Sequence, residues 1–209
     1  MQQITNIVPY DPRVFLVKDE QAAKDIILTP EASMTTDERW EAETKFLATK
    51  IQFPAHSLIL DIGCGIGRIA KELKHCFVIG TDISPSMRRL SSDYVGTPNF
   101  AALPPSLATE LVRNGLGFDG AVAIWALQHF LHLREEIDFI FHALKPEAKL
   151  YVLNRHNRCI PVQSGWRDDD QKVYALLGEK FNLRQDFMLP ASTFANGAFF
   201  ACFSKPGVS

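Results

Sequence analysis

The residues best suited to chemistry in this chain form a glycine-rich turn that directly follows an apolar run. Asp61 is followed at alternate positions by Gly63, Gly65 and Gly67, with Cys64 between the first two glycines. Glycines at these positions let the backbone turn tightly and approach a ligand closely. The acid at the head of the turn favours a cation, whereas the N–H groups of a following helix favour an anion. The turn therefore predicts a ligand that carries both charges.

A second acid indicates that the ligand is a nucleoside. Asp82 ends the next apolar run, 21 residues after Asp61, and an acid at that place accepts hydrogen bonds from ribose hydroxyls. A dinucleotide is the competing ligand, but in its G-x-G-x-x-G fingerprint the third glycine is replaced by Arg68, and Gly67 comes one position early. The charge of Asp61 would also oppose a pyrophosphate. S-adenosylmethionine has an ammonium, a carboxylate and a sulfonium and no phosphate, so it fits the turn better.

Strands and helices that alternate along the chain must position this turn. Thr35 and Glu38 form a capping-box pattern, which predicts a helix of about 15 residues. Apolar strands that alternate with helices predict a doubly wound α/β domain whose seven-stranded sheet is mostly parallel, with an antiparallel last strand. The turn then lies beyond the carboxyl end of the first strand, where such sheets bind ligands. After an irregular segment 1–33, we expect strands at 57–62, 77–82, 99–102, 118–125, 149–153, 182–189 and 198–204. We expect one helix at 68–75, one that begins at 84, one that ends at 144 and one at 170–180.

Four segments resemble the motifs of class I S-adenosylmethionine-dependent methyltransferases, in that family's order. They are residues 61–68, 80–87, 118–129 and 143–152, within a resemblance that covers roughly residues 35–204. The resemblance implies a Rossmann-like three-layer sandwich, the cofactor S-adenosyl-L-methionine and the product S-adenosyl-L-homocysteine. It also implies that Asp82 holds the ribose of this cofactor.

The resemblance assigns further cofactor residues. Ile83 and Met87 would flank the adenine, and Trp125 would line the pocket after the fourth strand. Arg39 and Trp40, on the helix before the first strand, resemble a cap over the methionine end of the cofactor.

Two segments depart from the family's pattern. The family often places an acid after its third strand to hold the adenine amino group, and residues 99–103 contain none. Backbone contacts from Ala101, Ala102 and Leu103 would substitute for it. The turn before the fifth strand has Glu147 and Ala148 where the family usually has two glycines, and we expect this to change only the geometry of that turn.

Polar residues after the fourth and fifth strands are the candidates for handling the methyl acceptor. Gln128 and His129 follow the fourth strand, and a histidine can accept a proton near neutral pH. A packing or capping role is the alternative for His129. Asn154 and Arg155 follow the fifth strand on the same rim, and an arginine there could bind a carboxylate or phosphate. We predict His129 as the catalytic residue and all four as substrate-binding residues.

Composition narrows the choice of partners and compartment. The net charge is −2 without a basic stripe, so a nucleic-acid partner is not expected. No apolar run reaches the roughly 20 residues of a membrane span, and the N-terminus does not resemble a signal peptide. The four cysteines form no CxxC pair, so we expect reduced thiols in a cytoplasmic protein and no metal site.

These observations predict a methyltransferase domain at 35–209, with residues 1–34 as a cover for the substrate. The expected reaction moves a methyl group from S-adenosylmethionine to a nitrogen or oxygen of a small molecule. The fourth-strand motif lacks the Asn-Pro-Pro-Tyr typical of enzymes that methylate amino groups of flipped adenine or of glutamine. The alternatives are a protein or RNA methyltransferase, a non-catalytic protein that binds the same cofactor, and a nicotinamide oxidoreductase. No sequence feature specifies an oligomeric state.

Overall fold

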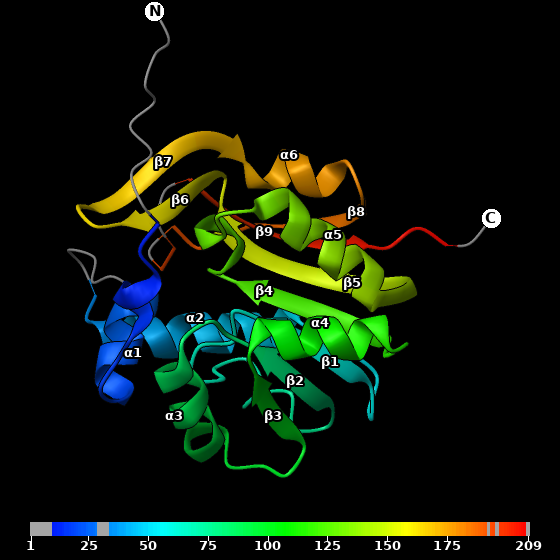
Figure 1. Ribbon diagram of the computed structural model, residues 1–209, viewed down its shortest axis with the longest axis horizontal. Helices are drawn as coiled ribbons and strands as arrows, with labels where there is room; N and C mark the ends of the chain where they lie inside the picture. The colour runs from blue at the N-terminus through cyan, green and yellow to red at the C-terminus, as the bar shows by residue number, and fades with distance from the viewer. Residues whose placement is uncertain (1–9, 29–33, 192, 195–196, 208–209) are drawn as a thin grey trace, which may run out of the picture.

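The computed structural model describes residues 10–28, 34–191, 193–194 and 197–207 of the 209-residue chain (Figure 1). They form a seven-stranded sheet with helices on both faces and a separate two-stranded sheet. The strand order in the large sheet is β3-β2-β1-β4-β5-β9-β8. Its members are β1 Leu58–Ile62, β2 Phe77–Thr81, β3 Phe100–Leu103, β4 Phe118–Ile124, β5 Leu144–Arg155, β8 Asn182–Phe187 and β9 Ala198–Ser204.

The pairing of the strands confirms the predicted sheet. Strands β1 to β5 pair in parallel, whereas β9 pairs antiparallel with both β5 and β8. Strand β1 has β2 on one side and β4 on the other, so the strand order reverses at β1. Ligands in such sheets bind in the crevice beyond the carboxyl ends of the strands at this reversal, and the glycine turn begins there.

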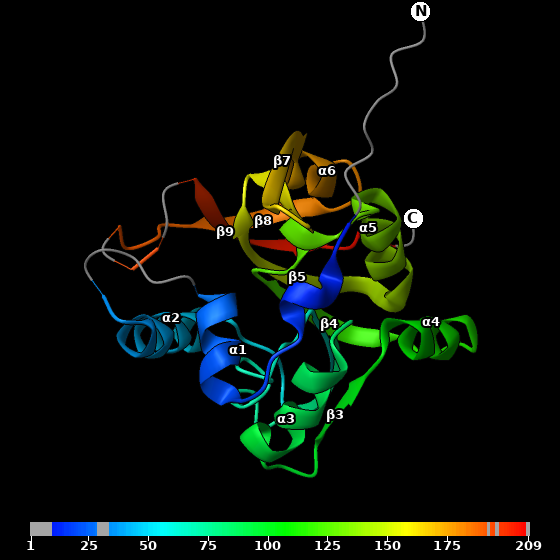
Figure 2. The same cartoon turned by 60° about the vertical axis from the view of Figure 1, so that its left-hand side comes forward.

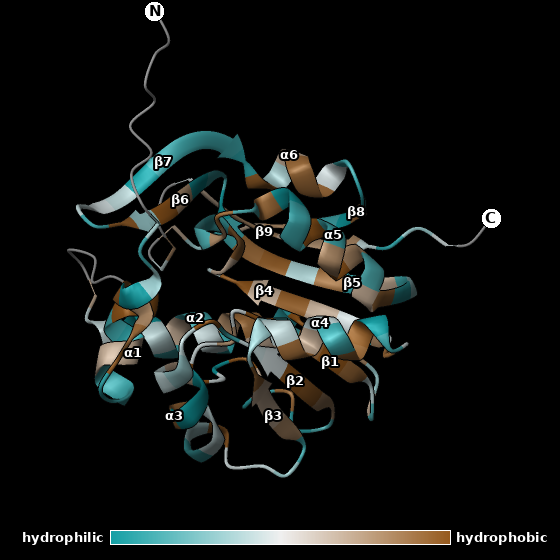
Figure 3. Cartoon of the chain, viewed as in Figure 1, coloured by the Kyte–Doolittle hydropathy of each residue, from teal (hydrophilic) through white to brown (hydrophobic). Residues whose placement is uncertain are grey.

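The central strands place alternate side chains in two apolar cores, one on each face of the sheet. Along β4, Val122 and Ile124 belong to one core, and Ala121 and Ala123 belong to the other. Because both faces are covered, the inner strands are mostly apolar and do not alternate between apolar and polar residues. Figure 3 shows this as brown strands in the middle of the sheet, with the polar β7 outside it.

Helix α2 (Thr36–Lys50) begins at the predicted capping box. The Glu38 N–H donates to Thr35 Oγ1 at 3.3 Å, and the Thr35 N–H donates to the Glu38 carboxylate at 2.9 Å. The remaining helices of the described residues are α1 Glu20–Ile27, α3 Pro85–Val95, α4 Pro105–Arg113, α5 Leu133–Ala143 and α6 Val173–Gly178, together with the short 3-10 helices η1 Pro12–Phe15 and η2 Leu127–His129.

Two predicted helices were wrong in whole or in part. Residues 68–75 form successive turns instead of a helix. The Lys71 N–H donates to Gly67 and the Leu73 N–H to Ile69, but the bonds do not form an unbroken helical series. The helix predicted at 170–180 exists only as α6. The residues before it form β7 (Gly165–Lys172), which pairs antiparallel with β6 (Asn157–Val162).

Helices α1 and α4 were not predicted. The segment 1–33 was expected to be irregular because of its prolines, yet Pro12 starts η1 and Asp19 caps α1 by accepting from the Ala22 N–H. Proline is compatible with the first turn of a helix because that N–H has no helical partner. Residues 1–9 and 29–33, with Pro9 and Pro30, lie outside the described residues. Every described helix is too short or too polar to cross a bilayer.

Candidate active site

A cavity of about 250 Å³ lies beyond the carboxyl ends of β1, β2 and β4. Residues 10–17 and the β6–β7 hairpin lie at this same end of the sheet (Figures 1 and 2). The cavity is lined by Tyr10, Phe15, Ile26, Ile27, Asp61, Gly63, Cys64, Gly65, Arg68, Ile69, Thr81, Asp82, Ile83, Met87, Pro105, Ile124, Trp125, Ala126, His129 and Phe130.

The glycine turn packs closely against Ala126, which follows β4. Gly63 has φ of +62°, and a Cβ at this position would lie 2.5 Å from the Cβ of Ala126, so a side chain here would both strain the backbone and collide. The Cys64 N–H donates to the Thr81 carbonyl at 2.9 Å and ties the turn to β2. Because no regular helix follows the turn, an anion here would meet individual N–H groups instead of a helix dipole.

Two acids lie on either side of this turn. Asp61 is 3% exposed, and its Oδ2 has no hydrogen-bond partner among the described residues. Burial, and secondarily the charge of Asp82, raise the pKa of Asp61 to about 8 against a lowering by Arg68. A buried polar atom without a partner is uncommon and calls for an explanation. A carboxylate on the cavity wall is suited to accept from a cationic ligand.

Asp82 is held by backbone donors on both sides. Its Oδ2 accepts from the Gly65 N–H at 2.9 Å and its Oδ1 from the Ser84 N–H at 2.8 Å. Burial raises the pKa of Asp82, and these two hydrogen bonds oppose that rise. Each carboxylate oxygen can accept a second hydrogen bond, so Asp82 is oriented and still able to bind a pair of hydroxyls.

A buried ionic network on α2 supports the floor of the cavity. The Glu43 carboxylate is 0% exposed and accepts from Arg39 Nε at 3.0 Å, from Arg68 at 3.3 Å and from the Trp125 indole N–H at 2.9 Å. The Arg68 guanidinium also lies 4.7 Å from the ring centroid of Trp40. Glu43 therefore connects α2, the glycine turn and the end of β4 through one carboxylate.

Trp125 adopts a backbone conformation that is rare for a bulky side chain. Its φ is +57°, in the left-handed region where aromatic residues are outliers. The Trp125 N–H donates to the Leu153 carbonyl at 2.7 Å, and the indole bond to Glu43 holds the other end of the residue. Such strain persists only where the surroundings impose it, and it is concentrated at functional sites.

His129 is the middle member of a hydrogen-bonded chain. Its Nδ1 lies 2.7 Å from the Cys159 carbonyl and its Nε2 lies 3.0 Å from Gln128 Nε2, while Gln128 Oε1 accepts from the Arg155 N–H at 2.9 Å. Since a carbonyl can only accept, Nδ1 carries the proton and Nε2 accepts from Gln128. Burial lowers the pKa of His129 to about 4. The imidazole is therefore neutral at pH 7, with one fixed tautomer.

The N-terminal segment crosses the cavity between the hairpin and α3. Tyr10 forms a β-bridge with Val162, and the Asp11 N–H donates to the Pro161 carbonyl at 3.0 Å. At the other end of this crossing, the Val17 N–H donates to Ser86 Oγ at 2.9 Å. These contacts attach residues 10–17 to the β6–β7 hairpin at one end and to α3 at the other.

Three rings from separate parts of the chain meet over the cavity, and we call them the aromatic wall: Phe15, His129 and Trp166. The ring centroids of His129 lie 5.6 Å from Phe15 and 4.8 Å from Trp166, and those of Phe15 and Trp166 lie 6.1 Å apart. Arg158 attaches the hairpin to the loop beneath, because it donates to the carbonyls of Phe130 and Leu131 and pairs with Asp169.

The structure brings many of the predicted cofactor residues to the cavity and leaves others away from it. Arg39 and Trp40 are buried behind the cavity, Gly67 and the β3 residues Ala102 and Leu103 do not line it, and Pro105 lies there instead. The predicted residues that line it are Asp61, Gly63, Cys64, Gly65, Asp82, Ile83, Met87 and Trp125.

Of the predicted substrate residues, His129 alone lines the cavity among the described residues. Gln128 and Asn154 are buried next to it, with the Gln128 N–H donating to Asn154 Oδ1 at 3.2 Å, and Arg155 is exposed. The prediction missed Arg68 and the N-terminal residues Tyr10, Phe15, Ile26 and Ile27. The sequence had suggested residues 1–34 as a cover, but it did not single out these four residues, because helices η1 and α1, which carry three of them, were not predicted.

Comparison with known proteins gives one family and several similar structures. A family model described as a methyltransferase domain matches residues 34–186. The cyclase SpnF is 15% identical, with a TM-score of 0.65 over 87% of this chain and 86% of that one. The N-methyltransferase NodS from Bradyrhizobium japonicum WM9 is 18% identical, with a TM-score of 0.60 over 82% and 99% of the two chains. A search of curated proteins gives no significant match.

A third similar structure contains ligands. It is phosphoethanolamine N-methyltransferase 1 from Haemonchus contortus, in complex with phosphoethanolamine and S-adenosylhomocysteine. It is 15% identical, with a TM-score of 0.62 over 83% of this chain and 44% of that one. At these identities the similarities establish a shared fold, and the same fold serves a cyclase as well as methyltransferases.

Proposed function

Because the chain belongs to the methyltransferase-domain family and is an S-adenosylmethionine-dependent methyltransferase, we propose that its methyl acceptor is a nitrogen or oxygen of a small molecule. The observation that carries the assignment of the cavity is the unpartnered Oδ2 of buried Asp61. A ligand ammonium at this place gives the carboxylate the donor that the protein does not supply. The bond would be charge-assisted once Asp61 is ionised.

The remaining cofactor contacts follow from the charges along the wall. Asp82 binds the ribose hydroxyls, since its two oxygens are oriented by backbone donors and can each accept again. Arg68 binds the carboxylate of the methionine part, because Glu43 accepts from one of its nitrogens and a guanidinium has five N–H donors. Ile83 and Met87 flank the adenine.

The chain contributes to catalysis chiefly by alignment. Bound S-adenosylmethionine supplies a methyl group on a sulfonium, which is a good leaving group. Trp125 and His129 then hold the acceptor in line with that methyl group, and alignment of two reactants supplies most of the rate in such a displacement. The low pKa of His129 makes it a weak proton acceptor near neutral pH, so its role as a base stays a prediction.

We include residues 1–34 in the proposal as the cover over the acceptor. The contacts of Tyr10, Asp11 and Val17 across the cavity support this role. The β6–β7 hairpin shares it, because Trp166 packs against His129. A cover that excludes water and macromolecules fits a small acceptor better than a protein or RNA chain.

Two measurements test the proposal. S-adenosylhomocysteine should raise the Tm of the protein and NAD should not, because only a ligand of the native state stabilises it. The Asp82→Ala variant should lose most of this stabilisation. Purified enzyme and methyl-labelled S-adenosylmethionine should transfer label to the small-molecule fraction of a cell extract. Label that enters only the protein or RNA fraction, or none at all, would contradict the proposed acceptor class.

A further inference from the structure

The charged side chains of the cavity wall come from one part of the chain, the glycine turn and the strand ends that flank it. They are Asp61, Arg68 and Asp82, and the proposed function uses all three for the cofactor. The wall on the other side comes from the N-terminal segment and the turn after β4. Its titratable members are Tyr10, whose pKa burial raises, and His129, whose pKa burial lowers to about 4. Both are neutral at pH 7.

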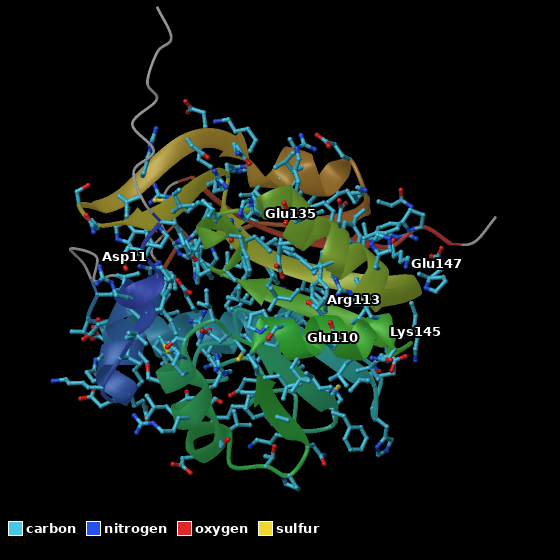
Figure 4. All side chains as sticks on the ribbon, in the orientation of Figure 1. Asp11, Glu110, Arg113, Glu135, Lys145 and Glu147 are labelled. Atoms are coloured by element: carbon cyan, nitrogen blue, oxygen red, sulfur yellow. The ribbon has the colours of Figure 1, made fainter. Side chains whose placement is uncertain are left out.

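The charges of the nearby hairpin do not line the cavity. Asp168 accepts from Asn157 and from the Asp170 N–H, and Asp169 pairs with Arg158. Two further arginines lie near the cavity without lining it: Arg88 donates to the Asp82 carbonyl at 2.6 Å, and the charge of Arg155 contributes to the lowered pKa of His129. Lys145 and Glu147 lie at the opposite end of the sheet from Asp11 (Figure 4). None of these charges lines the cavity among the described residues, so a charged acceptor between Phe15 and His129 would lose its hydration without a direct ion pair, which is strongly unfavourable.

The aromatic wall offers a different kind of contact. The distances between the centroids of Phe15, His129 and Trp166 are 4.8 to 6.1 Å, within the range in which aromatic rings attract one another. Phe15 lines the cavity from the cover, and His129 and Phe130 line it from the segment after β4. A flat apolar body placed there adds to an existing cluster of rings.

We infer that the methyl acceptor is an uncharged molecule that packs an apolar, ring-sized body against Phe15 and His129. This inference rests on the proposed function and specifies its substrate class. In the transfer, a lone pair of the acceptor oxygen or nitrogen forms the bond to the methyl carbon. The carbon–sulfur bond breaks with its electron pair on sulfur, and the acceptor's own proton leaves to water.

Matched probes that differ in charge test the inference. The protein is saturated with S-adenosylhomocysteine and titrated calorimetrically with methyl 4-hydroxybenzoate, 4-hydroxybenzoate and tyramine, which carry no charge, a negative charge and a positive charge. We expect the uncharged ester to bind at least tenfold more tightly than either ion. The Phe15→Ala variant should bind the ester roughly tenfold more weakly, because a ring contact is lost, while its affinity for S-adenosylhomocysteine stays within about twofold. Phe77→Ala removes an exposed ring at the other end of β2 and should change neither.

Equal or tighter binding of either ion would overturn the inference; tighter 4-hydroxybenzoate binding would point to recognition of a carboxylate by Arg155. A failure of all three probes to bind the loaded protein would also overturn it. These results would leave the proposed function intact, because the complex with S-adenosylhomocysteine is formed before the probes are added. Failure of S-adenosylhomocysteine itself to bind would instead contradict the proposed function, and the inference with it.

Discussion

Replacement of Asp61 by asparagine should stabilise the protein and weaken its affinity for the cofactor. The side chain keeps its shape but loses its charge. In the parent protein, the pKa of this acid is about 8 in the folded chain, compared with 3.8 for an ordinary aspartate. The folded state therefore retains a proton that the unfolded state releases above pH 3.8. The stability that this retained proton contributes is complete below pH 3.8. It decreases as the pH rises from 3.8 to 8 and is lost above that.

The magnitude follows from this difference in pKa. Each pH unit between the two values removes about 1.4 kcal/mol from the free energy of unfolding. Asp61→Asn does not titrate, so its advantage over the parent should be about 2 kcal/mol at pH 5, about 4 kcal/mol at pH 7 and nearly constant above pH 8. In a domain of this size, 1 kcal/mol corresponds to a change in Tm of about 2 to 4 °C.

The assay compares the Tm of the two proteins between pH 5 and pH 9 without ligand. Asp119→Asn is the matched control, because hydrogen bonds from Lys145 and the Leu58 N–H lower the pKa of Asp119. That variant should be less stable than the parent at neutral pH. A difference in Tm between Asp61→Asn and the parent that does not change with pH would refute the reasoning about burial.

Asp61→Asn should weaken ligand binding, whereas it raises the stability of the free protein. An ammonium beside Asp61 favours its ionised form, so the parent should release protons when it binds S-adenosylhomocysteine at pH 7. A hydrogen bond between charged groups contributes about 1.5 to 3 kcal/mol, so Asp61→Asn should bind roughly tenfold to a hundredfold more weakly in calorimetry. Equal affinity for the two proteins would remove Asp61 from the cofactor site.

Three further substitutions test other parts of the site. Glu43→Ala leaves Arg39 and Arg68 without their shared carboxylate and should lower the free energy of unfolding by about 3 to 5 kcal/mol in urea titration. Gly63→Ala meets Ala126 at 2.5 Å and should lower it by about 1 to 3 kcal/mol and abolish calorimetric binding of S-adenosylhomocysteine. The rate of methyl transfer should not fall as the pH is lowered through 6.5, because the pKa of His129 is about 4. A fall with a midpoint near pH 6.5 in the parent that is absent in His129→Gln would contradict this prediction.

The large sheet could be predicted from the sequence because its inner strands are covered on both faces and are therefore mostly apolar. The β6–β7 hairpin could not. Strand β7 is almost entirely exposed, so it lacks an apolar pattern, and its three consecutive acids from Asp168 resemble the cap of a helix. Strand β6 contains Pro161, and proline usually argues against a strand. Strand β6 also pairs with the distant residues Tyr10 and Asp11. A local sequence pattern cannot indicate such a contact.

The site divides in the same way. Asp61, Gly63 and Asp82 were found because the chemistry of the turn depends on neighbours along the chain. Phe15 reaches the cavity only because residues 10–17 fold back over the sheet, and its distance in sequence from His129 hides that contact. Glu43 lies four residues after Arg39, a spacing that predicts an exposed ion pair on a helix. Its burial depends on Trp125 and Arg68, which come from other elements.

Two features that oppose stability lie at the cavity, and others lie elsewhere. Asp61 has a buried oxygen without a partner, and Trp125 has a positive φ, while the two apolar cores behind them follow the regular alternation of a covered sheet. His56, Glu147 and Asp170 also have a positive φ, and Thr44 Oγ1 and Arg158 Nε are also buried without a partner among the described residues. Backbone strain and an unpartnered buried acid persist only if the rest of the fold stabilises them. Substitutions at Asp61 should therefore change stability and binding in opposite directions, whereas substitutions in the cores should lower both together.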